Sequence, residues 1–320
     1  MALLESVPNV SEGRDRAAVD AIAAAFARGG ARTVDLHVDA DHNRAVVTLL
    51  GADRELEEGL VAGIDEARRW IDLRHHTGAH PRVGAADVVP VVPLEPGDRP
   101  RAVAVADAVA RRVGSELGLP VFLYGAIGDG RRPAFFRQGG LQELERRLAA
   151  GEVRPAYGPD RLDPRAGAVL VGVRAPLVAF NLVLDGSLAA AREVAAAVRE
   201  SSGGLPGVQA LGLALRQDLV QVSTNLVDVD ATPLHVLVER IAAEAAARGA
   251  RVGEGELVGL LPAACVESAA LAAGVPEALD AEGLPSAAAL SAAARALRLG
   301  RLDADRVLEW RLAHVRGAPR

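Results

Sequence analysis

The chain repeats one order of predicted strands and helices. Apolar runs and alternating patterns predict strands at about 3–8, 32–39, 44–51 and 87–93, and helical periodicity predicts helices at about 14–28 and 54–71. The same β-α-β-β-α-β order returns over about 177–260, displaced by about 174 positions. A sequence that uses one supersecondary plan twice is expected to fold as two similar units.

This order is that of the split-βαβ, ferredoxin-like plan, in which both helices lie on one face of an antiparallel sheet. We therefore predict an α+β fold of two ferredoxin-like subdomains, residues 1–175 and 176–320, packed around a central cleft. A doubly wound α/β fold is the alternative, because Gly125, Gly128 and Gly130 follow an apolar run at 121–124. Their spacing differs from the dinucleotide fingerprint, and turn glycines explain it more simply.

The segments outside the two repeats have weaker patterns. Residues 100–118 and 141–150 are amphipathic and predict helices, whereas the stretch from 125 to 140 is predicted to be irregular. After the second repeat, residues 287–299 and 303–314 predict surface helices that form a helical C-terminal tail for packing or dimerisation.

Composition excludes several classes of function. The 320 residues are 50% hydrophobic and 24% charged with a net charge of −6, which is typical of a soluble globular protein. All 36 cationic side chains are arginine, so a Schiff-base or P-loop lysine is excluded while bidentate recognition of carboxylates stays open. No basic stripe with interleaved aromatic residues occurs, and we expect no nucleic-acid partner.

The sequence also predicts where the protein works. It opens without a basic stretch followed by an apolar run, and no apolar segment approaches the roughly 18 residues needed to span a bilayer. Cys265 is the single cysteine. We therefore expect a cytoplasmic protein without membrane association.

A histidine-rich segment, residues 74–87, is the strongest candidate for chemistry. It lies between a helical pattern and a buried-strand pattern and holds three histidines, two arginines and two glycines. Histidine takes and returns a proton near neutral pH, and Pro81 restricts the backbone beside His80. A surface turn without catalytic function is the alternative interpretation of the same residues.

A metal site is another interpretation of the same segment. His76 and His80 have the i, i+4 spacing of zinc ligands on a helix, but Gly78 and Pro81 disfavour a helix there. No second cluster of paired ligands accompanies them, and only one cysteine is present. We predict that the protein binds no metal.

Several collinear motifs carry a resemblance to a known family. They are VPNVSEGR at 7–14, DADHNR at 39–44 leading into Val47-Thr48, HPRVG at 80–84, VFLYG at 121–125, Gly158-Pro159, Gly167, Gly172 with Arg174, AFN at 179–181 and QVSTN at 221–225. With these motifs the chain resembles the glutamate formimidoyltransferases, the family that includes the transferase part of formimidoyltransferase-cyclodeaminase. Their spread over about 1–300 makes the resemblance specific.

The resemblance implies transfer of a formimidoyl group from N-formimidoyl-L-glutamate to tetrahydrofolate as co-substrate, giving L-glutamate and 5-formimidoyltetrahydrofolate. The histidine before Pro-Arg is catalytic in the family, so this role falls on His80 as general acid and base. The resemblance also implies a homodimer. Any cyclodeaminase partner is expected to be a separate protein.

Further site residues are predicted from side-chain chemistry. Arg44 and Arg82 are candidate clamps for a donor with two carboxylates. Asp39 is predicted to orient His80 or to stabilise the cationic amidine, with Asn43 beside the substrate; a strand-end turn is the alternative for both residues. Tyr124, with Tyr157, is a stacking candidate in a chain with few aromatic residues.

In the family, folate lies along the segment that here runs from Gly158 to Gly167. Its members are Gly158, Pro159, Asp160, Arg161, Leu162, Asp163, Pro164, Arg165, Ala166 and Gly167. Backbone groups at Gly158 and Gly167 and the guanidinium of Arg161 or Arg165 are the predicted contacts. The interior of this segment differs from that of animal members of the family, because it lacks serines and has Ala166 in place of an aromatic residue near its end. A second difference is Ala79, which stands where members of the family have an acidic residue just before the catalytic histidine.

Two other functions fit the same residues. One is another folate-dependent one-carbon transferase on this scaffold, for example one with formylglutamate as donor. The other is a catalytically silent folate-binding or small-molecule-binding protein, in which His80 and Arg82 would have no chemical role.

Overall fold

The computed structural model describes residues 2–215 and 219–317. The chain divides into two compact units, Met1–Pro176 and Leu177–Arg320, each with its own sheet. The predicted α+β class is confirmed.

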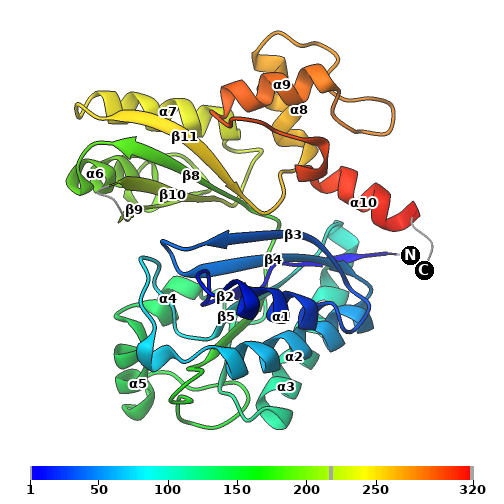
Figure 1. The fold of residues 1–320 in the computed structure, drawn as a ribbon, viewed down its shortest axis with the longest axis vertical. Helices are drawn as coiled ribbons and strands as arrows, with labels where there is room; N and C mark the ends of the chain where they lie inside the picture. Colours follow the sequence, from blue (N-terminus) through cyan, green and yellow to red (C-terminus); the bar gives the residue numbers. More distant parts are fainter. Residues whose placement is uncertain (1, 216–218, 318–320) are drawn as a thin grey trace. The chain divides into compact units, whose positions relative to one another are not determined.

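The first unit is built on a seven-stranded sheet (Figure 1). Its strands are β1 (Leu4–Ser6), β2 (Asn9–Val10), β3 (Arg32–Asp39), β4 (Arg44–Gly51), β5 (Ala86–Val92), β6 (Val121–Gly125) and β7 (Val169–Val173). The order is β1-β4-β2-β5-β7-β6, with β3 on β4. The single strand predicted at 3–8 is two short strands, because Pro8 has no N–H to give to a ladder.

Two strands extend this sheet beyond the four that the repeat predicted. β7 pairs in parallel with β5, and β6 pairs in parallel with β7. Along β7, Val169, Val171 and Val173 enter one core whereas Leu170 enters another, so both faces are buried. A strand buried on both faces is a continuous apolar run without alternation, which explains why the pattern did not separate it from a buried loop.

Helices cover both faces of the first sheet. α1 (Arg16–Phe26), α2 (Asp53–Trp70) and α3 (Arg99–Glu116) pack on one face, and α4 (Pro133–Arg137) and α5 (Gly140–Ala149) pack on the other. Phe136 of α4 and Leu144 of α5 contact the same core as Phe122 of β6. The stretch predicted to be irregular therefore contains one short helix, which brings Arg137 to the sheet.

The second unit has the element order predicted for its residues. It contains β8 (Val178–Asp185), α6 (Leu188–Val198), β9 (Val208–Ala214), β10 (Val220–Leu226), α7 (Leu234–Ala246) and β11 (Arg251–Val258). The sheet is antiparallel with the order β11-β8-β10-β9 (Figure 1). Phe180, Leu182 and Leu184 of β8 share a core with residues of α6 and α7, so both helices lie on one face.

The C-terminal tail differs from its prediction. α8 (Ala263–Ala272) was not predicted, and α9 (Ala287–Ala296) is a core helix, with Ala289, Ala292 and Ala293 fully buried in the second unit. The helix predicted from 303 begins only at α10 (Leu308–Gly317), after a 3-10 turn at Ala304–Arg306. Alanine gives little contrast between helix faces, so its burial was not visible in the sequence.

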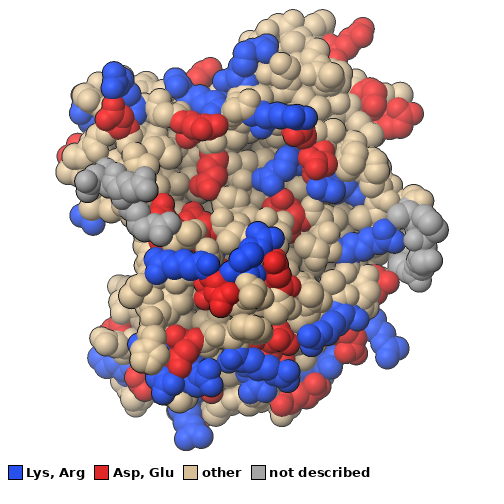
Figure 2. Space-filling view, viewed as in Figure 1, with Lys and Arg blue, Asp and Glu red and all other residues tan. Residues whose placement is uncertain are grey.

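Charges of both signs are interspersed on the face drawn in Figure 2, where every blue side chain is an arginine. Among the described residues, no helix combines the length and the apolar character needed to cross a bilayer.

Candidate active site

Asn43 joins three segments of the first unit at the turn between β3 and β4. Its Oδ1 accepts a hydrogen bond from the Gly13 N–H at 2.9 Å, and its Nδ2 donates to the Thr77 carbonyl at 3.0 Å. Its backbone is left-handed (φ 49°), a conformation that asparagine tolerates better than most residues. A Cβ on Gly13 would lie 2.1 Å from the Asp39 carbonyl oxygen, so only glycine fits there. Asn43 thus holds the turn against the histidine-rich loop.

Arg82 stabilises the backbone of that loop. Its Nε donates to the His80 carbonyl at 3.1 Å, its Nη2 donates to the His42 carbonyl at 3.1 Å, and its Nη1 contacts His76. Arg82, predicted to clamp a substrate carboxylate, therefore directs these donors to the histidine-rich loop and to the β3–β4 turn. Its position fixes His80 relative to the β3–β4 turn.

His80 is half-buried, and its imidazole has partners at one nitrogen. Nδ1 lies 2.8 Å from the Pro81 carbonyl oxygen and 3.1 Å from Nη1 of Arg44. Nε2 makes no hydrogen bond with any residue that the structure describes. Burial lowers the pKa of His80 well below its usual value, and the nearby Arg44 and Arg137 guanidinium groups lower it further. The ring is therefore neutral at pH 7.

Asp87 at the start of β5 is completely buried and contacts Arg44, which in turn contacts His80. Its Oδ1 accepts from the Val83 N–H at 2.8 Å, and its Oδ2 accepts from Arg44 Nη1 at 3.1 Å and from Arg137 Nη2. Burial alone would raise the pKa of Asp87, but Arg137 and Arg44 outweigh it and lower the pKa. The carboxylate stays ionised, and the three charges sum to about +1 beside the imidazole.

Sequence reasoning missed both Asp87 and Arg137 as site residues. Asp87 could have been recognised from its place at the start of an apolar strand, because a carboxylate buried there needs a cationic partner. Arg137 gave no such signal, since it lies 50 positions away in a helix of five residues.

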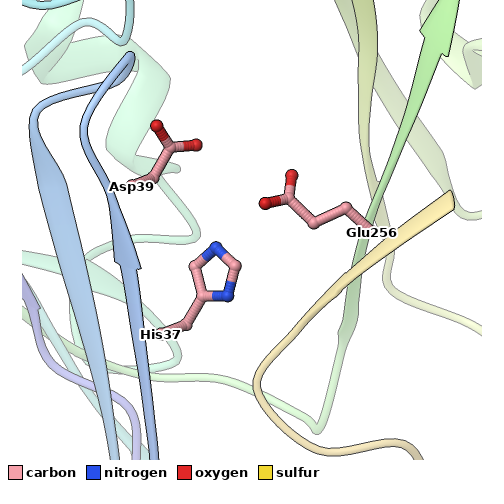
Figure 3. Close-up of side chains that lie close together, drawn as sticks. All are labelled: His37, Asp39 and Glu256. Atoms are coloured by element: carbon pink, nitrogen blue, oxygen red, sulfur yellow. The ribbon is translucent and has the colours of Figure 1, made fainter. Parts of the chain in front are cut away.

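Asp39 is paired with His42 rather than with His80. Its Oδ2 lies 2.7 Å from His42 Nδ1, and its Oδ1 accepts from the N–H groups of Asp41 and His42. Burial would raise the pKa of Asp39, but the hydrogen bonds from His42 outweigh it and lower the pKa to about 2. The His42 ring meets the His80 ring edge-on at 6.1 Å between centroids. His37 and Asp39 project from one face of β3 (Figure 3).

The two tyrosines lie in different environments. Tyr124 is 3% exposed within the core that contains Phe122 and Phe136, and burial raises the pKa of its phenol to about 12. The Tyr124 phenol therefore stays protonated, and its ring faces other core residues. Tyr157 is half-buried, and its hydroxyl donates to Asp107 at 2.6 Å.

The end of the 158–167 segment is joined to the histidine-rich loop. Ala168 N–H donates to the Val83 carbonyl at 2.8 Å, and Ala85 N–H donates to the Ala166 carbonyl at 2.8 Å. Gly167 has φ +70°, and its N–H and C=O both bond to the Asp163 backbone, at 2.8 and 3.0 Å. The predicted ligand contacts of the Gly167 backbone are thus already used within the protein.

Other members of this segment reach solvent. Gly158, Asp160, Arg161, Pro164 and Arg165 are exposed, and Pro159, Leu162 and Asp163 are half-buried. The Arg165 guanidinium lies 3.4 Å from Asp72. Of the two arginines in this segment, Arg161 is the one whose side chain forms no ion pair with a described residue.

The second unit has a polar cluster on three neighbouring strands. Glu256 of β11, drawn in Figure 3, accepts from Asn181 Nδ2 of β8 at 2.8 Å and from Gln221 Nε2 of β10 at 3.3 Å. Asn181 and Gln221 belong to motifs that carried the family resemblance, but sequence reasoning gave them no role.

Comparisons with known proteins agree with this architecture. The family model "Formiminotransferase domain, N-terminal subdomain" matches residues 3–174, and "Formiminotransferase domain" matches residues 179–272. The glutamate formimidoyltransferases of Streptococcus pyogenes serotype M1 and Thermoplasma acidophilum are 36% and 37% identical over 82% of this chain and 89% of their own. The formimidoyltransferase-cyclodeaminase of Sus scrofa is 38% identical over 81% of this chain, which spans half of that relative.

The α+β units and the matched relatives together define a transferase enzyme. The chain belongs to the formiminotransferase family, as its motifs predicted.

Proposed function

We propose that this enzyme transfers the formimidoyl group of N-formimidoyl-L-glutamate to tetrahydrofolate, with His80 as general acid and base. Two relatives that this chain matches over 89% of their length are named glutamate formimidoyltransferase, which supports the donor. The observation that carries the role of His80 is an Nε2 with no hydrogen-bond partner within the described chain, on a ring whose pKa is lowered by burial and by the nearby arginines.

The reaction needs one proton acceptor that later becomes a donor. The N5 amine of tetrahydrofolate attacks the amidine carbon, and His80 Nε2 takes the proton that N5 loses. The imidazolium then gives this proton to the glutamate nitrogen as its bond to the amidine carbon breaks. The products are L-glutamate and 5-formimidoyltetrahydrofolate, and His80 returns to its neutral form.

Pro81 and Arg44 act on Nδ1 in different ways, because a carbonyl accepts a hydrogen bond whereas a guanidinium can only donate one. When Nδ1 donates to the Pro81 carbonyl, Nε2 carries the lone pair of a general base. Protonation of Nε2 then gives an imidazolium whose Nδ1–H keeps the same carbonyl partner. Arg44 at 3.1 Å disfavours the charged ring, which promotes return of the proton to the leaving group.

Substrate contacts are proposed from the remaining free groups. Arg44 and Arg82 direct their donors to protein partners, so their function in this proposal is to hold His80 and its loop. We propose that folate lies along residues 158–167, with Arg161 facing one of its carboxylates. Asp39 is ionised and paired with His42, and in this proposal its negative charge stabilises the cationic amidine from the side of the site where His42 lies.

The remaining features rest on the sequence and, for the homodimer, on the family resemblance. We propose a cytoplasmic homodimer that needs no metal, and a cyclodeaminase partner, if one acts with it, in a separate chain.

An absorbance assay tests this proposal. Purified protein with tetrahydrofolate and N-formimidoyl-L-glutamate should form 5-formimidoyltetrahydrofolate, and N-formyl-L-glutamate should react more slowly. Faster reaction with the formyl donor would identify a different transferase on the same scaffold. Folate binding without turnover of either donor would indicate a silent binding protein.

A further inference from the structure

Three side chains from three elements form a buried charge bridge. Arg44 opens β4, Asp87 lies at the start of β5, and Arg137 ends α4. The Asp87 side chain is fully buried, and each arginine side chain is only 13% exposed. Taking three ionised groups out of water is costly, so a bridge with this geometry needs a reason beyond filling space.

The buried charge bridge contacts His80 through Arg44. Arg44 Nη1 lies 3.1 Å from both Asp87 Oδ2 and His80 Nδ1, so the atom that contacts the carboxylate also contacts the ring. On its other side, Arg44 donates from Nε and Nη2 to Asn9 Oδ1 at 2.9 and 2.6 Å. The guanidinium plane is fixed from two sides, and this fixes the position of the Arg44 charge beside Nδ1.

Asp87 also holds the backbone that carries His80. Its Oδ1 accepts from the Val83 N–H at 2.8 Å, three residues after the histidine. Arg137 in turn bonds the same Oδ2 as Arg44 and keeps that carboxylate facing the loop. The backbone and the ring of His80 therefore depend on one carboxylate and its two cations.

We infer that Asp87 and Arg137 are positioning residues for His80, acting through Arg44 to set the orientation and the proton distribution of its imidazole. The inference rests on the proposed role of His80 in proton transfer. Neither residue needs to touch substrate for this role.

The charges around the ring explain why two arginines are needed. Arg44 from β4 and Arg137 from α4 face His80, His42 faces it from the β3–β4 turn, and the Pro81 carbonyl faces Nδ1. One arginine would only neutralise Asp87. The second makes the bridge positive and disfavours a protonated ring.

The test compares Arg137→Met with Arg132→Met. Arg132 precedes the same helix, is exposed and has no side-chain partner among the described residues, so it is a matched loss of one guanidinium. The His80 ring signal, assigned by its loss in His80→Ala, is titrated by NMR in the substrate-free protein. We expect the pKa of His80 to rise by about one unit in Arg137→Met and to stay at its wild-type value in Arg132→Met.

Steady-state kinetics supply the second readout. Arg137→Met should lower kcat by about 10- to 100-fold with KM nearly unchanged, because an interaction that serves the transition state is lost. A raised KM with unchanged kcat would make Arg137 a substrate clamp and overturn the inference. An unshifted His80 titration in folded Arg137→Met would overturn it as well.

Two further measurements keep the test decisive. If Arg137→Met does not fold, Arg137→Gln removes the same charge and carries the same expected shift. In the wild-type protein, a His80 titration at or above pH 6.5 would contradict the inference directly. The titrations need no substrate, so they decide the positioning role even if the protein proves to transfer a different group.

Discussion

Nη1 of Arg44 lies 3.1 Å from Nδ1 of His80, although the two residues are 36 positions apart. The same nitrogen lies 3.1 Å from Oδ2 of Asp87. Arg44 therefore connects the proposed catalytic ring to a buried carboxylate, whereas its role as a clamp for a substrate carboxylate stays a prediction.

Replacing Arg44 by methionine should lower kcat by about 10- to 100-fold, because His80 loses the cation that lies beside Nδ1 and disfavours the protonated ring. KM for the donor should change little. Steady-state kinetics of Arg44→Met check this, with the exposed Arg28→Met as control. A large rise in KM at constant kcat would restore the clamp interpretation.

The pH dependence of kcat/KM should reflect the low pKa of His80. The neutral ring is the base, so activity should persist below pH 6.5 and decline only as the pH falls to the depressed pKa. A profile measured from pH 5 to 8 checks this. In Arg137→Met the acidic limb should move to higher pH. An acidic limb at or above pH 6.5 in the wild-type enzyme would contradict the account.

The same depressed pKa has a consequence for stability. The unfolded chain binds a proton at His80 near pH 6.5, whereas the folded chain resists protonation to lower pH. His80 therefore destabilises the fold increasingly as the pH drops below about 6.5. Urea unfolding at pH 7.5 and 5.5 should show a smaller pH effect in His80→Gln than in wild type. An equal effect in both would indicate that His80 titrates normally.

Asp87→Asn should be strongly destabilising. It leaves two buried guanidinium groups without their carboxylate, and breaking such a pair costs about 3–5 kcal/mol. Urea unfolding gives the free energy change. Asp129→Asn is the matched control, because Asp129 is exposed and asparagine tolerates its left-handed backbone (φ 53°). Equal stability of the two variants would mean that the bridge contributes nothing.

Gly167 should resist substitution more than Gly130, although their φ angles are +70° and +71°. A Cβ on Gly167 would lie 2.2 Å from the Val83 carbonyl oxygen, whereas nothing lies within 4 Å of one on Gly130. Both alanine variants carry the backbone strain of about 1 kcal/mol, but only Gly167→Ala must also move the histidine-rich loop. We expect a further loss of stability and of kcat in that variant alone. Matching melting temperatures would contradict this.

Much of the fold could be predicted because its repeats have strong periodicity. In the second unit, helical and alternating patterns gave the element order of β8 to β11. The strands β6 and β7 were not placed, since a parallel strand buried on both faces has no alternating pattern. Alanine-rich α8 and α9 show propensity but little contrast between faces, so the burial of Ala292 was not predictable.

The candidate site was predictable only where its residues are close in sequence. His80, Pro81 and Arg82 form a local motif that histidine chemistry and family resemblance both identified. Arg137 reaches Asp87 through the packing of α4 against β6, a tertiary contact that no local pattern encodes. Tyr124 was chosen for its aromatic ring, but its place on a strand buried on both faces puts that ring in the core.

The most direct test of the central claim is single-turnover formimidoyl transfer by His80→Ala, with tetrahydrofolate binding measured in parallel. We predict that transfer falls by about two or more orders of magnitude while tetrahydrofolate binds as in wild type. Full transferase activity in this variant, with binding unchanged, would contradict the role of His80.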